Sequence, residues 1–168
     1  MFVLGIDPGL TRCGFGLVEG SFESAESFRA LRAGVLETEA GLEVEMRLAQ
    51  IHADLDALII DLRPQVVVVE RVFFQRNALT AIPVAQASGI AIGLAGSRGL
   101  VVRQFTAQQV KLAVTGYGAA PKSQVQAMVA KLCSLSEIPE PADAADALGL
   151  AITYFMTERV ERRFMVRA

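Results

Sequence analysis

The sequence contains few of the residues that form disulfide frameworks, zinc sites and catalytic triads. It has two cysteines, one histidine and no tryptophan in 168 residues. Cys13 and Cys133 are too few for a disulfide framework and too far apart along the chain for a zinc site. The single histidine, His52, is the one candidate for a Ser-His-Asp or Cys-His catalytic group, and no motif supports that role. Phosphate-binding loops of the G-x-x-x-x-G-K-[ST] or G-x-G-x-x-G type are missing as well.

Signals for export and for membrane insertion are also missing. Residues 1–7 contain neither a basic region nor a long apolar run, so we expect no secretory leader. Residues 77–97 carry no charge, but they include Asn77, Pro83 and Gln86 and are rich in alanine and glycine. That composition favours a buried helix over a transmembrane span. We therefore expect a cytoplasmic protein without a membrane partner.

Acidic residues are absent from the middle of the chain. Residues 71–136 contain no Asp or Glu but seven basic residues, including all three lysines, although the whole chain has a net charge of −2. A surface that faces phosphates needs cations without competing carboxylates. The distribution therefore favours a nucleic-acid partner over chance clustering in an apolar region, in spite of the sequence pI near 5.5.

The hydrophobic pattern predicts an α/β protein with a mixed five-stranded sheet flanked by helices. Three short strands with short connections come first, which is typical of an antiparallel meander. A later run of four valines is typical of a parallel strand buried on both faces. Because no linker divides the chain, we expect one domain over residues 1–168, with residues 160–168 prone to fraying. The predicted strands cover residues 2–7, 13–19, 27–38, 66–70 and 100–105, and the predicted helices cover 42–62, 78–95, 106–114, 121–133 and 143–163.

Four carboxylates lie at the ends of the most apolar predicted elements. Asp7 ends the first strand and Glu70 ends the four-valine strand, so adjacent strands would place both at one sheet edge, where α/β proteins bind ligands. Asp143 and Asp146 share one face of the last helix, among alanines that allow close approach. A turn for Asp7 and a helix N-terminus for Asp143 are the ordinary structural interpretations. Together the four acids favour a hard-cation site, in which two ions about 4 Å apart would assist phosphoryl transfer.

Four short motifs occur in order along the chain. They are Gly5-Ile-Asp-Pro-Gly9, Val69-Glu-Arg-Val-Phe73, Lys122-Ser-Gln-Val125 and Asp143-Ala-Ala-Asp-Ala147. In this order they resemble the bacterial RuvC-type Holliday junction resolvases, over about residues 2–154. The resemblance implies a ribonuclease-H-like fold and a homodimer. It also implies a Mg²⁺- or Mn²⁺-dependent endonuclease of DNA recombination and repair, with a pair of ions in each active site. Such an enzyme nicks two strands of like polarity across a four-way DNA junction, leaving 5′-phosphate and 3′-hydroxyl ends.

The same resemblance implies roles for individual residues. By motif match, the metal-binding catalytic quartet would be Asp7, Glu70, Asp143 and Asp146. Some relatives carry histidine at the position of Asp143, so an aspartate here implies an all-oxygen site. Lys122 matches a basic residue that stabilises negative charge near the scissile phosphate, and it counts among the catalytic residues. The expected DNA-binding residues are Phe73, which would insert among the junction bases, Phe74, Arg76, Asn77, Lys111 and Lys122.

The resemblance further implies cooperation with the RuvA–RuvB branch-migration complex. The uncharged helix at residues 78–97 is our prediction for part of the dimer surface. Three other interpretations stay open: a related nuclease acting on structured RNA, an actin-like phosphotransferase and a catalytically inactive DNA-binding subunit. The actin-like interpretation needs a second large domain, for which 168 residues leave no room. The presence of all four acids argues against an inactive subunit.

Overall fold

The computed structural model describes the backbone of residues 1–23, 28–72 and 78–165, and the side chains of these residues except 78–80. Five strands form one sheet in the order β3-β2-β1-β4-β5. The first three are antiparallel, whereas β4 runs parallel to β1 and β5 parallel to β4. Both the meander and the mixed five-stranded sheet predicted from the sequence are confirmed. The strands are β1 (Phe2–Asp7), β2 (Arg12–Glu19), β3 (Arg29–Glu37), β4 (Val66–Glu70) and β5 (Val101–Phe105).

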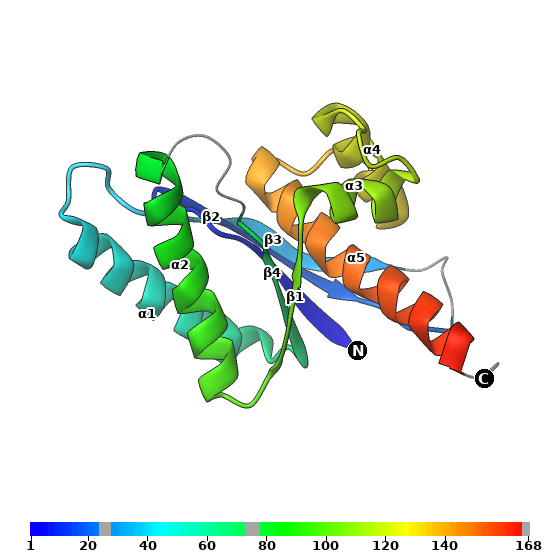
Figure 1. Ribbon diagram of the computed structural model, residues 1–168, viewed down its shortest axis with the longest axis horizontal. Helices are drawn as coiled ribbons and strands as arrows, with labels where there is room; N and C mark the ends of the chain where they lie inside the picture. Colours follow the sequence, from blue (N-terminus) through cyan, green and yellow to red (C-terminus); the bar gives the residue numbers. More distant parts are fainter. Residues whose placement is uncertain (24–27, 73–77, 166–168) are drawn as a thin grey trace.

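Helices cover the sheet on two sides (Figure 1). On one side lie α1 (Val44–Leu62) and α2 (Ala78–Ser97), and on the other lie α3 (Ala107–Thr115), α4 (Lys122–Leu132) and α5 (Ala142–Met165). Each side has its own hydrophobic core. In β4, Val66 and Val68 belong to the core under α5, while Val67 and Val69 belong to the core under α1 and α2. Burial on both faces explains the unbroken valine run.

Several helix boundaries follow from local sequence. The Thr106 hydroxyl accepts a hydrogen bond from the backbone N–H of Gln109, and the Gln109 side chain accepts one from the backbone N–H of Thr106. This reciprocal capping box fixes the start of α3, as expected from Thr106. Gly116 ends α3 with a left-handed φ of 77°, a conformation that glycine adopts without strain.

The end of α5 differs from the prediction. The helix continues to Met165, so residues 160–165, which were expected to fray, are helical. Two contacts support this last part: the Arg162 guanidinium lies 4.0 Å from the centre of the Phe22 ring, and Glu158 pairs with Arg103. Among the described helices, none has the length and hydropathy needed to cross a membrane.

Glycines in β1 and β2 allow α5 to pack directly on the sheet backbone. A Cβ atom at Gly5 would lie 1.9 Å from the carbonyl oxygen of Ala147, and one at Gly14 would lie 2.3 Å from that of Asp143. Any side chain at these positions would push the helix away. The close approach predicted from the alanines around Asp143 and Asp146 is confirmed, and it brings the first turns of α5 beside the end of β1.

Candidate active site

Asp7 and Glu70 leave adjacent parallel strands at the same edge of the sheet. Ile6 pairs with Val69 in the β1–β4 register, so the two acids that follow are neighbours. Their side chains are within hydrogen-bonding distance of each other. The sequence-based expectation that both carboxylates meet at one sheet edge is therefore confirmed as geometry.

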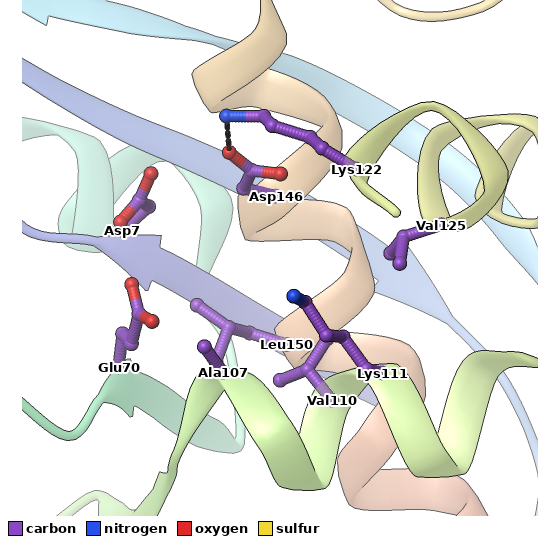
Figure 2. A pocket seen from close by; sticks show the side chains of 9 residues that line it. All are labelled: Asp7, Glu70, Ala107, Val110, Lys111, Lys122, Val125, Asp146 and Leu150. Atoms are coloured by element: carbon purple, nitrogen blue, oxygen red, sulfur yellow. Dashed lines mark ion pairs between the residues drawn. The ribbon is translucent and has the colours of Figure 1, made fainter. Parts of the chain in front are cut away.

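A cavity of about 350 Å³ opens at this edge. Figure 2 shows Asp7 of β1 and Glu70 of β4 on one side of it and Lys111 of α3 on the other, while Asp146 of α5 lies beside the ammonium group of Lys122 of α4. The cavity is lined by Asp7, Glu70, Ala107, Val110, Lys111, Lys122, Val125, Asp146 and Leu150. Acidic and basic groups thus face each other across a space large enough for part of a nucleotide.

The carboxylates perturb one another strongly. The pKa of Asp7 is raised from 3.8 to about 8, first by burial, then by its hydrogen bond with Glu70 and by the negative charges of Glu70, Asp146 and Asp143. Burial and the neighbouring acids therefore favour the protonated form of Asp7 in the metal-free protein. A cation placed among these groups would reverse the effect.

Lys122 neutralises one of the acids. Its ammonium group lies 2.6 Å from Oδ2 of Asp146, and this hydrogen bond raises the pKa of Lys122. The Lys122 side chain is 58% exposed and the Asp146 side chain 27%, so the pair is open to solvent on the lysine side. A ligand entering the cavity can therefore compete for either partner.

Asp143, the fourth predicted acid, does not line the cavity. It is near enough for its charge to act on Asp7, but Nε of Arg12 donates to its Oδ2 at 3.0 Å. Arg12 also pairs with Glu37 at 2.6 Å, its cross-strand neighbour in the β2–β3 register. The sequence analysis missed Arg12. The cross-strand pairing with Glu37 could have suggested an ion pair, but not its contact with Asp143.

A buried arginine holds the turn that follows Asp7. Arg47, on α1, is 9% exposed and donates to the hydroxyls of Thr11 (2.6 Å) and Thr38 (2.9 Å). The Thr38 hydroxyl in turn donates to the carbonyl oxygen of Leu10 at 2.6 Å. These bonds fix the β1–β2 turn that carries both Asp7 and Arg12. Arg47 was also missed, because nothing in the local sequence indicates its hydroxyl partners.

The acid-free stretch does not form one phosphate-facing surface. Lys111 and Lys122 line the cavity, as predicted. Arg98, however, pairs with Asp56, and Arg103 pairs with Glu158, so both are engaged with acids from outside the stretch. These two arginines therefore do have competing carboxylates, because folding supplies acids that the linear pattern lacked.

Four of the expected DNA-binding residues lie outside the part of the chain that the structure describes. They are Phe73, Phe74, Arg76 and Asn77.

The donor set fits a hard divalent cation. Asp7, Glu70 and Asp146 offer only carboxylate oxygens, which Mg²⁺ and Mn²⁺ prefer. In the present conformation, the described His, Cys, Asp and Glu residues include no group of three that is arranged to hold a metal ion. Lys122 and Arg12 instead engage Asp146 and Asp143. A cation bound to Asp146 or Asp143 would therefore compete with these two basic groups.

Comparison with known proteins identifies relatives along nearly the whole chain. The family model for crossover junction endodeoxyribonuclease RuvC matches residues 3–154. The RuvC endonuclease of Frankia alni is 50% identical over 154 residues, covering 92% of this chain and 77% of that protein. That of Thermomicrobium roseum is 48% identical over 159 residues, covering 95% of each chain. These matches favour the resolvase interpretation over the RNA-nuclease and actin-like ones.

Solved structures agree with the sequence comparison. Thermus thermophilus RuvC superposes with a TM-score of 0.86 at 36% identity, covering 96% of this chain and 97% of that one. The same protein in complex with a Holliday junction substrate gives a TM-score of 0.85 at 32% identity, covering 95% and 96%. The yeast mitochondrial resolvase Ydc2, 14% identical with a TM-score of 0.70, shares the fold, covering 98% of this chain and 84% of that one. The predicted ribonuclease-H-like fold is confirmed, and the chain belongs to the RuvC family of crossover junction endodeoxyribonucleases.

Proposed function

We propose that this protein is a Holliday junction resolvase that acts in DNA recombination and repair. It makes paired nicks in strands of like polarity across a four-way junction and leaves 5′-phosphate and 3′-hydroxyl ends. One observation carries the proposal: in a chain of the RuvC family, the carboxylates of Asp7, Glu70 and Asp146 line a single open cavity together with Lys111 and Lys122. A related protein, Thermus thermophilus RuvC, has been solved in complex with a Holliday junction substrate.

The carboxylates are assigned to metal binding. Asp7, Glu70 and Asp146 would hold Mg²⁺ or Mn²⁺, as a pair of ions, with Asp143 joining them on release from Arg12. When bound, such ions activate a water for attack on the phosphodiester and stabilise the leaving oxygen. The burial of Asp7 and the negative charges of Glu70, Asp146 and Asp143 that act on it support this assignment, because they make its ionised form costly without a cation.

The lysines are assigned to the phosphate. Lys111 and Lys122 line the same cavity as the acids, and Lys122 contacts Asp146, so both would be within reach of a phosphodiester bound at the carboxylates. Lys122 would leave Asp146 for the phosphate and stabilise the negative charge that develops during cleavage. By motif match, Phe73 would insert among the junction bases, where base–aromatic stacking would contribute about 1–3 kcal/mol. Phe74, Arg76 and Asn77, which follow it in the sequence, would contact the DNA as well.

A homodimer would account for paired nicks, because a twofold protein places two equivalent sites on a twofold junction. We assign part of the dimer surface to α2, on which Ile82 is 50% exposed. Residues 1–168 form one nuclease domain in this proposal. It works in the cytoplasm with the RuvA–RuvB branch-migration complex.

The direct test compares cleavage of a synthetic four-way junction with that of a linear duplex of the same sequence. Wild type and Asp7→Asn are incubated with Mg²⁺, with Mn²⁺ and with chelator, and junction binding is measured in parallel. We expect symmetric nicks in the junction alone, only with metal, and at least about 1,000-fold slower in Asp7→Asn, which still binds. Binding without cleavage in either metal would support the inactive DNA-binding subunit instead. Cleavage of structured RNA in preference to the junction would support the RNA nuclease.

A further inference from the structure

The position of Asp7 depends on the turn that follows it. Asp7 is the last residue of β1, and its partner in the neighbouring strand β2 is Gly14. On the β4 side the pairing ends one residue earlier, at Ile6 and Val69. Residues 8–11 then reverse the chain, starting with a proline, which has no backbone N–H to donate. The carboxylate of Asp7 is therefore placed by β2 and by this turn.

The turn is held by the end of β3 and by α1. Thr38, the residue after β3, binds it twice: its backbone N–H donates to the carbonyl oxygen of Thr11 at 3.1 Å, and its hydroxyl donates to that of Leu10 at 2.6 Å. Arg47 joins the two threonines, because its Nη2 donates to the hydroxyl of Thr11 at 2.6 Å and its Nε to that of Thr38 at 2.9 Å. Both bonds come from one planar guanidinium, so the two hydroxyls are fixed relative to each other.

Stability alone does not account for a cation in this place. Arg47 is 9% exposed, and none of the ion pairs among the described residues includes it. Taking a charge out of water costs free energy, and neutral hydroxyls return less of it than a carboxylate does. An apolar side chain filling the same space would stabilise the fold at least as well. What the apolar side chain could not supply is the rigid fork of donors that binds Thr11 and Thr38.

We propose that Arg47 is a positioning residue for the metal site: through Thr11 and Thr38 it holds the turn that places the carboxylate of Asp7 beside that of Glu70. The inference rests on the proposed function and deepens it, because metal binding by these acids is part of that function. Mg²⁺ demands near-ideal octahedral geometry, so a small displacement of Asp7 lowers the affinity for the ion. Removing groups that orient metal ligands from outside the coordination shell typically costs about 10- to 100-fold in affinity or activity.

The experiment measures Mn²⁺ binding by electron paramagnetic resonance without DNA, and junction cleavage as a function of Mg²⁺ concentration. Wild type is compared with Arg47→Met, which removes the donors, and with Arg47→Lys, which keeps the charge but not the fork. Thr11→Val removes one acceptor at an exposed position. The matched control, Leu55→Ala, removes a buried side chain from the same helix but no bond to the turn. Thermal unfolding defines a temperature at which all variants are folded.

We expect the Mn²⁺ dissociation constant to rise about tenfold in Arg47→Met and several-fold in Arg47→Lys and Thr11→Val. Cleavage by these variants recovers most of the wild-type rate when Mg²⁺ is raised to saturation, because the ligands themselves are intact. Leu55→Ala lowers the unfolding temperature and leaves Mn²⁺ binding at the wild-type value.

Equal Mn²⁺ affinity in wild type and Arg47→Met, or an equal loss of affinity in Leu55→Ala, overturns the positioning role and leaves Arg47 a purely structural residue. Wild-type binding in Arg47→Lys also overturns it, because the charge and not the fork would then be what matters. If Arg47→Met does not fold, Arg47→Lys and Thr11→Val provide the same test. A wild type that neither binds Mn²⁺ nor cuts a junction contradicts the proposed function itself, which separates the two failures.

Discussion

The two sides of the catalytic cavity are built differently. The acidic side (Asp7, Glu70 and Asp146) comes from β1, β4 and α5, elements that pack directly on one another and leave these acids half-buried. The basic side (Lys111 and Lys122) consists of long side chains from α3 and α4, and that of Lys122 is 58% exposed. The fold fixes the acids against their mutual repulsion, whereas the lysines hold their positions with little loss of solvation. Holding the three acids in place therefore lowers the stability of the folded protein, whereas holding the two lysines in place does not.

The largest effect is expected from a substitution that displaces α5, which carries Asp146, from the sheet that carries Asp7 and Glu70. Gly5→Ala would place a Cβ 1.9 Å from the Ala147 carbonyl oxygen and force α5 off the sheet. We expect the free energy of unfolding to fall by roughly 2–4 kcal/mol, as for severe overpacking of a core, and cleavage to be lost. Urea unfolding and junction cleavage measure both.

Gly93→Ala is the matched control, because a Cβ there meets nothing within 4 Å in the middle of α2. It should stabilise the protein by about 0.5–1 kcal/mol. Equal stability of Gly5→Ala and wild type would show that α5 does not need the glycine.

On the basic side, Lys122→Met should separate activity from stability. The Lys122–Asp146 pair is largely exposed on the lysine side, so its loss should change the free energy of unfolding by less than about 1 kcal/mol. Cleavage should fall about 100-fold, because a cation at the developing charge is removed. Single-turnover cleavage and thermal unfolding test this, with Lys131→Met, at the exposed end of α4, as control. A large loss of stability would instead place Lys122 in the structural framework.

The stability cost on the acidic side should depend on pH. The pKa of Asp7 is about 8 in the folded protein and 3.8 in its unperturbed state, so the folded state binds the extra proton between these values. Metal-free stability should therefore fall as pH rises from about 4 to 8, because the unfolded state gives up that proton more readily.

Asp7→Asn removes this dependence and should raise stability above wild type at pH 8.5 by roughly 1–3 kcal/mol. Thermal unfolding in chelator at pH 5 and 8.5 measures it, with exposed Glu39→Gln as control. A wild type that becomes more stable as pH rises over this range would refute the argument.

The smallest effect is expected at the rim of the acidic side. Arg12→Gln frees Asp143 from its guanidinium partner, which competes with a cation for the carboxylate. We expect the Mg²⁺ concentration for half-maximal cleavage to fall about two- to fivefold, in line with the modest worth of an exposed ion pair. A metal titration tests this, with Arg32→Gln, which breaks the pair with Asp61, as control. A rise in the required Mg²⁺ would mean that Arg12 positions Asp143 for the metal.

Those positions of the acids that follow from the backbone pattern could be predicted from the sequence. Asp7 and Glu70 could be placed together because each ends an apolar strand, and Asp143 and Asp146 because they share a helix face among small residues. Arg12 and Arg47 could not be found in this way. Their partners, a carboxylate and two threonine hydroxyls, come from segments distant along the chain, and no local pattern encodes which long side chain will reach them.

Residues 71–136, the stretch without acids, also show that a linear pattern does not reveal contacts with distant segments. The charge count along residues 71–136 left out acids elsewhere in the chain. In the folded protein α5 lies beside β5, and its Glu158 pairs with Arg103. Long polar side chains therefore escape prediction more readily than buried acids at strand ends.

The sheet separates two hydrophobic cores, and Arg47 reaches from the α1 side to the turn beside Asp7. Mutations in the α1–α2 layer and in the α3–α5 layer should therefore affect the active site differently. The core under α1 and α2 contains Ile6 and Val69, which directly precede Asp7 and Glu70, whereas the core under α5 holds the helix that carries Asp146. A programme of stabilising mutations should therefore begin on the apolar residues of α1 and α2 themselves and leave Ile6, Val69 and Arg47 untouched, because these three support the strands and the turn beside the catalytic acids.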